Sequence, residues 1–195
     1  MYTVSVSIDI AAAPATVREK FLDFCQLPVY HRDGFFKSIG PETPNTPLEP
    51  GVKMRNVLEL MTVHATLVEN SSTCFQWGGG LPGIFVGYHS FCFEPSTLVQ
   101  GGTKFTQKEE FKGFLAFIMG DNFVARWIGT MEKTRKGWNK YNEDLKAWCE
   151  GLNNRKTSTP KIVPIHSNSY GYPAVGKFFS TLVVKYVHLV PSLDS

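Results

Sequence analysis

The chain has 195 residues, of which 43% are hydrophobic and 19% are charged. This length predicts one domain with an appendage, large enough to bury a core without disulfides or metals. The apolar and aromatic content excludes a disordered chain, and the sequence lacks the repeats of collagen-like and coiled-coil proteins.

The net charge of +3 is unevenly distributed along the chain. Residues 1–153 carry 15 Lys and Arg against 16 Asp and Glu, whereas residues 154–195 carry five against one. The larger part is therefore not basic, and we expect no nucleic-acid partner. No apolar run is long enough for a membrane span, and the N-terminus lacks the pattern of a secretory signal. We therefore expect a cytoplasmic protein without an integral membrane segment.

The sequence offers little support for metal or cofactor chemistry. The four cysteines are widely spaced without a C-x-x-C pair, which argues against a zinc site or a disulfide framework and predicts reduced, buried thiols: Cys25, Cys74, Cys92 and Cys149. Five scattered histidines do not form a metal-binding pattern. No dinucleotide fingerprint is present, and the glycine-rich stretch 78–83 lacks the lysine of a phosphate-binding loop. We expect no cofactor, no metal, and a mobile rim loop at 78–83.

The first part of the chain alternates strand and helix signals. Residues 2–10 alternate apolar and polar side chains, which predicts a half-buried strand. Pro14 is expected to open a helix with an apolar stripe of Val17, Phe21, Phe24 and Cys25, which Leu27–Pro28 ends. A short helix or turn is expected over 29–34, and the four prolines within 40–51 predict a loop.

Closely spaced strands and one long helix follow. Strands are expected at 52–58, 61–67, 74–78, 84–94 and 103–112, and the short connections make them antiparallel. From Asp121 the apolar period changes to that of a helix, which extends to Gly151 with Trp138, Tyr141 and Leu152 on its apolar face. This order predicts an α+β fold: a curved antiparallel sheet of six to seven strands around the long helix, with a ligand cavity between them.

Several segments resemble one known superfamily. The opening VSVSIDIAAAPATVREKFLDF is similar to its first strand and proline-started helix, and LPVYHRDGFFKSI to its second helix. LEPGVKMRN, GYHSFCFEP and GGTKFTQKEEFKGFL are similar to its later strands. Over residues 1–152 the chain resembles the START and birch-pollen-allergen superfamily, whose helix-grip fold also occurs in polyketide cyclases and aromatases. The resemblance implies a hydrophobic ligand cavity without implying one chemistry, since fold alone does not fix function.

The candidate catalytic residues come from the faces of two strands. In 103–112 the lysines mark the solvent face, so Phe105, Gln107, Glu109 and Phe111 are expected to face the cavity. In 84–94 the inward set includes His89 and Phe91. Two hairpin registers are possible, which place His89 opposite either Gln107 or Glu109, about 5 Å away at Cβ.

A carboxylate and an imidazole in an apolar cavity form a candidate general acid–base pair. His89, Glu109 and Gln107 are therefore the candidate catalytic residues. Two other readings stay open: the pair orients a ligand, or it is a structural hydrogen bond between buried polar groups.

The candidate ligand-binding residues are aromatic or lie near the expected cavity mouth. Asn56 is polar on an otherwise apolar strand face and is expected to bind a ligand carbonyl or to mark an edge or bulge position. Tyr30 and His31 are candidates for a gate, although a solvated turn histidine is the alternative. The aromatic candidates, which also fit plain core packing, are Phe75, Trp77, Phe91, Phe105 and Phe111.

Residues 153–195 are expected to form a linker and an amphipathic appendage. Apolar residues recur at helical spacing over 175–190, although the β-branched content also permits a strand. Such a face should be buried against the domain, against a second copy in a homodimer, or on a membrane surface.

Two functions compete. The first is a cofactor-independent cyclase, dehydratase or isomerase, hence a lyase or isomerase of secondary metabolism, acting on a polyketide-like molecule. The second is a non-catalytic carrier of a lipid or an aromatic molecule. Buried ionisable groups favour the enzyme. Their desolvation costs free energy, and a pure carrier would gain little from such groups.

Overall fold

The computed structural model describes residues 2–59, 61–81, 85–112 and 121–152. The first strand, β1 (Tyr2–Ile10), leads into α1 (Pro14–Leu22), the 3-10 turn η1 (Phe24–Gln26) and the short helix α2 (Leu27–Tyr30). The strands that follow are β2 (Phe36–Ser38), β3 (Lys53–Leu58), β4 (Thr62–Asn70), β5 (Cys74–Leu81), β6 (Phe85–Pro95) and β7 (Thr103–Lys112). The long helix α4 spans Asp121–Cys149.

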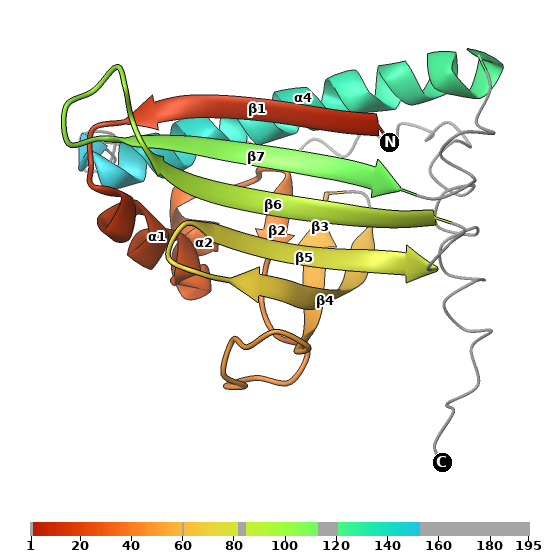
Figure 1. Ribbon diagram of the computed structural model, residues 1–195, viewed down its shortest axis with the longest axis horizontal. Coiled ribbons are helices and arrows are strands. Elements are labelled where there is room, and N and C mark those ends of the chain that lie inside the picture. Colours follow the sequence, from red (N-terminus) through yellow and green to blue (C-terminus); the bar gives the residue numbers. More distant parts are fainter. Residues whose placement is uncertain (1, 60, 82–84, 113–120, 153–195) are drawn as a thin grey trace, which may run out of the picture. The chain divides into compact units, whose positions relative to one another are not determined.

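The strands form one antiparallel sheet in the order β1-β7-β6-β5-β4-β3-β2. Consecutive strands from β2 to β7 are neighbours, and β1 joins the far edge beside β7. The sheet curves around α4, which lies along β1, while α1 and α2 pack at one end (Figure 1). The α+β class and the helix-grip architecture predicted from the sequence are confirmed, and the sheet has seven strands, at the upper end of the predicted six to seven.

Local sequence explains why the first helix is shorter than predicted. Pro14 occupies the start of α1, where its missing N–H costs nothing, and Val17 and Phe21 are buried. The helix ends at Leu22 rather than at Leu27–Pro28, and Leu27 instead begins α2 with a proline in its first turn. Pro28, which was predicted to end the first helix, therefore lies in the first turn of the next one. Cys25, which was predicted to belong to the apolar stripe of the first helix, is exposed.

The structure also corrects the prediction of a loop at the glycine-rich stretch. Residues 78–81 were expected to belong to a loop, yet they continue β5, where Gly78 pairs with Tyr88 and Gly79 with Gly87. Gly80 has a φ of 126°, which a residue with a side chain rarely adopts. The paired strand β6 supplies hydrogen bonds that override the weak strand propensity of glycine. Residues 82–83 of that predicted rim lie outside the described residues.

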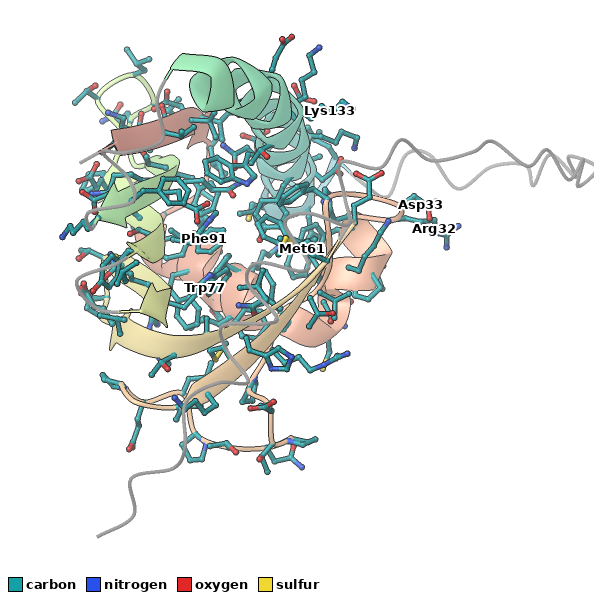
Figure 2. All side chains as sticks on the ribbon, turned by 90° about the vertical axis from the view of Figure 1, so that its right-hand side faces the viewer. Arg32, Asp33, Met61, Trp77, Phe91 and Lys133 are labelled. Atoms are coloured by element: carbon teal, nitrogen blue, oxygen red, sulfur yellow. The ribbon has the colours of Figure 1, made fainter. Side chains whose placement is uncertain are left out.

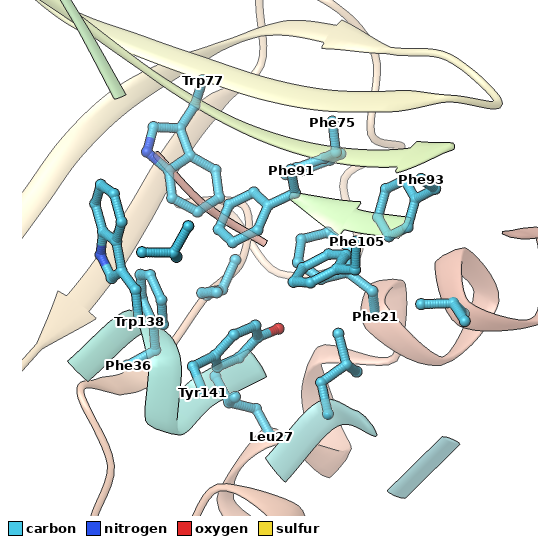
Figure 3. Packing of buried hydrophobic residues seen from close by; sticks show 14 of the residues in the cluster. Phe21, Leu27, Phe36, Phe75, Trp77, Phe91, Phe93, Phe105, Trp138 and Tyr141 are labelled. Atoms are coloured by element: carbon cyan, nitrogen blue, oxygen red, sulfur yellow. The ribbon is translucent and has the colours of Figure 1, made fainter. Parts of the chain in front are cut away.

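Aromatic side chains fill much of the space between the sheet and the helices. Trp77 and Phe91 point from the sheet toward the helix side (Figure 2). Phe21 of α1 contacts phenylalanine rings on three strands, with centroids 4.7 Å from Phe91 and 5.3 Å from Phe93 (Figure 3). From α4, Trp138 and Tyr141 are buried as predicted and Leu145 is buried too, whereas Leu152 follows the helix and is exposed.

The predicted linker and appendage at 153–195 lie outside the described residues, so their packing stays a prediction. None of the helices in the described part of the chain is long and apolar enough to cross a membrane.

Candidate functional site

The site is built from the inward faces of β5, β6 and β7. Trp77 is paired with His89, and His89 with Glu109, so three side chains on adjacent strands lie in one row. This is the second of the two hairpin registers that the sequence allowed. Alternation then places Phe91 beside Gln107 in the next row, as expected for side chains on one face.

His89 and Glu109 form a close pair. The Nδ1 atom of His89 lies 3.3 Å from Oε2 of Glu109, and their side chains are 6% and 26% exposed. Because the carboxylate faces Nδ1, it favours the tautomer in which Nδ1–H donates to Glu109 and Nε2 keeps its lone pair. The Nε2 atom is buried without a hydrogen-bond partner. The pair therefore has a partly solvated end at Glu109 and an unused acceptor at its buried end.

Aromatic rings fix the orientation of the imidazole. The His89 ring stacks on Trp77 at a centroid distance of 5.3 Å and an angle of 19°. Trp138 of α4 and Phe36 of β2 contact it edge-on, at 4.8 Å and 5.9 Å. Contacts on both sides hold the ring in one plane, so Nε2 presents its lone pair in a fixed direction.

Small residues follow this row along the concave face. Gly79 and Gly87 are directly paired. Gly79 lies two residues after Trp77, and Gly87 lies two residues before His89. A Cβ built on Gly87 would lie 3.4 Å from the ring of Phe111 and 3.5 Å from Oε1 of Glu109. A Cβ built on Gly79 would lie 3.3 Å from the carbonyl oxygen of His64, so both glycines stand where a side chain would touch neighbouring atoms beside the carboxylate.

Asn56 adds a second unsatisfied group on the concave side of the sheet. The residue is 1% exposed, and neither its amide nitrogen nor its amide oxygen has a hydrogen-bond partner. A buried amide without partners costs about 1–3 kcal/mol. Asn56 pairs with Val63 in the regular part of the β3–β4 ladder, and β3 lies between β2 and β4, so the alternative of an edge or bulge position is wrong.

Gln107 connects the sheet to the helix. Its Nε2 donates to Oδ1 of Asn142 at 2.6 Å and contacts the carbonyl oxygen of Trp138 at 3.3 Å. The side chain is fully buried, and its Oε1 atom has no partner. Gln107 thus shares the inward face with Glu109, but its amide is directed to α4.

The predicted aromatic residues divide into two groups. Phe75 and Phe105 are fully buried and pack against Phe21, with centroids 5.5 Å and 6.3 Å away. Trp77 and Phe91 contact His89 directly, at 5.3 Å and 4.5 Å. Phe111 is 9% exposed and lies next to Gly87. Phe75 and Phe105 therefore belong to the apolar packing, and the other three surround the acid–base pair.

Tyr30 and His31 are both buried against α4. The Tyr30 hydroxyl lies 3.1 Å from that of Tyr141, and burial raises the pKa of both phenols. The His31 Nδ1 atom lies 2.7 Å from Oδ2 of Asp144, and burial lowers the pKa of His31 despite this carboxylate. The alternative of a solvated turn histidine is wrong, because the His31 side chain has no exposed surface.

Sequence reasoning missed the contributions of Trp138, Asn142 and Gly79. Trp138 was recognised only as part of an apolar helix face, and Asn142, next to Tyr141 in sequence, was not recognised at all. Glycine at 79 and 87 falls at inward positions of two strands, and that alternation was the one signal available in advance. The described residues contain no group of three His, Cys, Asp or Glu side chains arranged to hold a metal.

Comparison with known proteins establishes the family. The profile described as polyketide cyclase/dehydrase and lipid transport matches residues 1–140, so the chain belongs to this family. No curated protein matches the sequence.

Solved structures show the same fold at low sequence identity. The Zhui aromatase/cyclase from Streptomyces sp. R1128 is 10% identical, with a TM-score of 0.56 over 81% of this chain and 99% of that one. A hypothetical protein of Helicobacter pylori is 14% identical, with a TM-score of 0.54 over 76% and 88%. A START superfamily protein from Mycobacterium smegmatis is 14% identical, with a TM-score of 0.52 over 78% and 99%.

Proposed function

We propose that the protein binds a flat hydrophobic molecule that carries a hydroxyl or carbonyl group, and that His89 and Glu109 transfer a proton on this molecule. The reaction would be a cofactor-independent cyclisation, dehydration or isomerisation of a polyketide-like compound. The observation that carries the proposal is the buried Nε2 atom of His89, which has no partner although Nδ1 faces a carboxylate. A buried acceptor without a partner is favourable where a ligand supplies the missing hydrogen bond.

The geometry supports distinct tasks for the two groups. Nε2 of neutral His89 can accept a proton from a ligand hydroxyl or from carbon beside a carbonyl, and the resulting imidazolium is stabilised by Glu109. Glu109 retains some exposure, so protons can return to water through its carboxylate. Trp77 and Phe91, whose rings contact His89, offer aromatic surfaces for the ligand, and Gly79 and Gly87 add no side chain to the face on which it would lie. Asn56 is a further hydrogen-bonding group for a ligand oxygen.

A non-catalytic carrier is the second candidate. It is favoured by the family, which joins lipid transport to cyclases, and by the complete burial of Gln107 in contacts to α4. In that case His89 and Asn56 only orient a ligand.

One probe separates the two functions without knowledge of the natural ligand. The bicyclic ketone 2-tetralone has acidic protons beside its carbonyl, and their exchange for deuterium is followed by NMR in heavy water. We expect the wild type to accelerate exchange and Glu109→Gln to lose about 10²-fold or more of that acceleration. Binding of 2-tetralone, measured by tryptophan fluorescence, should stay within a few-fold in the variant. Bound ketone with exchange no faster than in buffer would refute the enzyme and favour the carrier.

A further inference from the structure

A second chemically distinct site lies on the opposite, convex face of the same strands. Cys74 of β5 and Cys92 of β6 are directly paired in the sheet register. Their neighbours Phe75 and Phe91 point inward and are fully buried, so the cysteines point outward. Both are free thiols of intermediate exposure, contrary to the prediction of buried cysteines.

The backbone pattern brings the two thiols close together. The amide of Phe93 donates to the carbonyl oxygen of Thr73 at 2.9 Å, which makes the preceding pair, Cys74 and Cys92, a non-hydrogen-bonded pair. Such pairs have Cα atoms about 4.5 Å apart, within the range of about 4.4–6.8 Å that a disulfide requires. The next pair on this face, Gln76 and Ser90, is joined by a side-chain hydrogen bond of 2.7 Å, which holds the two strands in register.

The hydrogen bond between the two thiols, together with nearby charges, gives the two sulfurs unequal pKa values. The hydrogen bond from the Cys74 thiol, aided by Lys108 of β7, lowers the pKa of Cys92 to about 7. The same hydrogen bond raises the pKa of Cys74, and burial adds to the effect. Burial, and then Glu94 of β6 and Glu69 of β4, oppose ionisation of Cys92, yet the net change of its pKa is downward. Cys92 is thus the nucleophilic sulfur near neutral pH, and Cys74 is the thiol that reacts in the second step.

We propose that Cys74 and Cys92 form a thiol–disulfide exchange site that takes small-molecule disulfides and closes to a reversible cross-strand disulfide. The Cys92 thiolate attacks one sulfur of the small disulfide, forms a mixed disulfide and releases one thiolate. Cys74 then gives its proton to water, attacks the Cys92 sulfur and expels the second thiolate. The two protein thiols are oxidised, and one small disulfide is reduced to two thiols.

The order of the two steps follows from the interaction between the thiols. While Cys92 is a thiolate, the proton shared with it keeps Cys74 protonated. Capping of Cys92 removes that negative charge, so Cys74 becomes free to ionise and react. A small dithiol reverses both steps by the same exchange.

The test uses the full-length, reduced wild-type protein and oxidised glutathione. Trypsin leaves both cysteines within one peptide, residues 56–104, because this segment contains no Lys or Arg before Lys104. A second digestion with chymotrypsin cleaves at aromatic residues between them, so two fragments remain joined only by the disulfide. We expect a linked Cys74–Cys92 product under non-reducing conditions and its loss after dithiothreitol.

Two variants identify the roles of the sulfurs. Cys74→Ser should stop at a glutathione adduct on Cys92, whereas Cys25→Ser, at an exposed cysteine, should leave the cross-strand product unchanged. Thermal unfolding of each variant checks that it is folded. The proposal is overturned if wild-type Cys92 stays unmodified, if it stays as the glutathione adduct, or if the linked fragments join a different pair.

Discussion

The two ends of the concave face are built on opposite principles. At the end next to α1, Phe21, Phe75, Phe93 and Phe105 pack ring against ring and carry no polar group. Toward the other end, the same strands carry a histidine–glutamate pair and two glycines, and β3 adds the buried amide of Asn56, which has no partners. The first end contributes stability through apolar burial, and the second retains unsatisfied groups that cost stability. Function is therefore expected where the packing is least favourable for the fold alone.

The largest difference between the two ends should appear when an apolar ring is removed. Phe21→Ala deletes the ring that contacts phenylalanines on three strands, and large-to-small core changes of this kind cost about 3–5 kcal/mol. Urea denaturation should show this loss in the free energy of unfolding. Val29→Ala, at a side chain 71% exposed, is the control and should change the free energy by less than about 0.5 kcal/mol. A loss below 1 kcal/mol for Phe21→Ala would contradict the assignment of this end as the stabilising core.

Two buried asparagines give an opposite pair of effects. Asn56→Leu removes an amide with no partners, so the free energy of unfolding should rise by about 1–3 kcal/mol. Asn142→Leu removes the acceptor of the Gln107 amide and should lower it by a similar amount. Both residues are 1% exposed, which makes them a matched pair for denaturation experiments. If Asn56→Leu destabilises the protein, its amide is not a group held ready for a ligand.

The glycine pair predicts a smaller, separable effect. The methyl group added by Gly87→Ala makes only ordinary van der Waals contacts. The free energy of unfolding of this variant should therefore equal that of the wild type or exceed it by about 0.4–1 kcal/mol, because alanine lowers the entropy of the unfolded chain. The added methyl group lies beside Glu109 and Phe111, and binding of 2-naphthol should weaken several-fold in fluorescence titrations. Gly40→Ala, with nothing within 4 Å of its Cβ, is the control that leaves binding unchanged. Unaltered binding in Gly87→Ala would place the ligand elsewhere.

The smallest effect concerns acid stability at His31. Burial lowers the pKa of His31 in the folded state, so the unfolded chain binds more protons, and stability falls as pH drops below the ordinary value of about 6.5. Asp144 and Lys140 of α4 and Lys37 of β2 face this group and tune the shift. His31→Asn retains a donor toward Asp144 without a titratable ring. Its free energy of unfolding, measured between pH 5 and 7, should depend less steeply on pH than that of the wild type, and an equal slope would contradict this account.

Periodicity and strand alternation predicted the architecture well. The lysines at 104, 108 and 112 identified the outer face of β7, and the same alternation placed His89, Gln107 and Glu109 inside. Sequence could not decide between the two hairpin registers, because the turn that sets the register is long and irregular. It also could not show that Gln107 bonds to α4 or that Cys74 faces Cys92, because those contacts depend on how distant segments meet in space.

The ends of helices and strands were predicted least accurately. Proline and glycine were interpreted as ends of elements at Leu27–Pro28 and at Gly78–Gly80, yet one begins a helix and the other continues a strand. Local propensity is weak enough for a paired neighbouring strand or a packed helix to override it. His31 was missed as a buried residue for a related reason, since its burial depends on Asp144 and Tyr141 of a helix more than 100 residues away in sequence.

The central claim is that Nε2 of His89 receives the polar group of a bound ligand. NMR of the imidazole nitrogens tests it directly, with the His89 signal assigned by its absence in His89→Phe. Addition of 2-naphthol should move the Nε2 resonance of His89, whereas naphthalene, which has the same rings without the hydroxyl, should bind and leave that resonance nearly unchanged. Saturating 2-naphthol with no movement at His89 Nε2 would contradict the account.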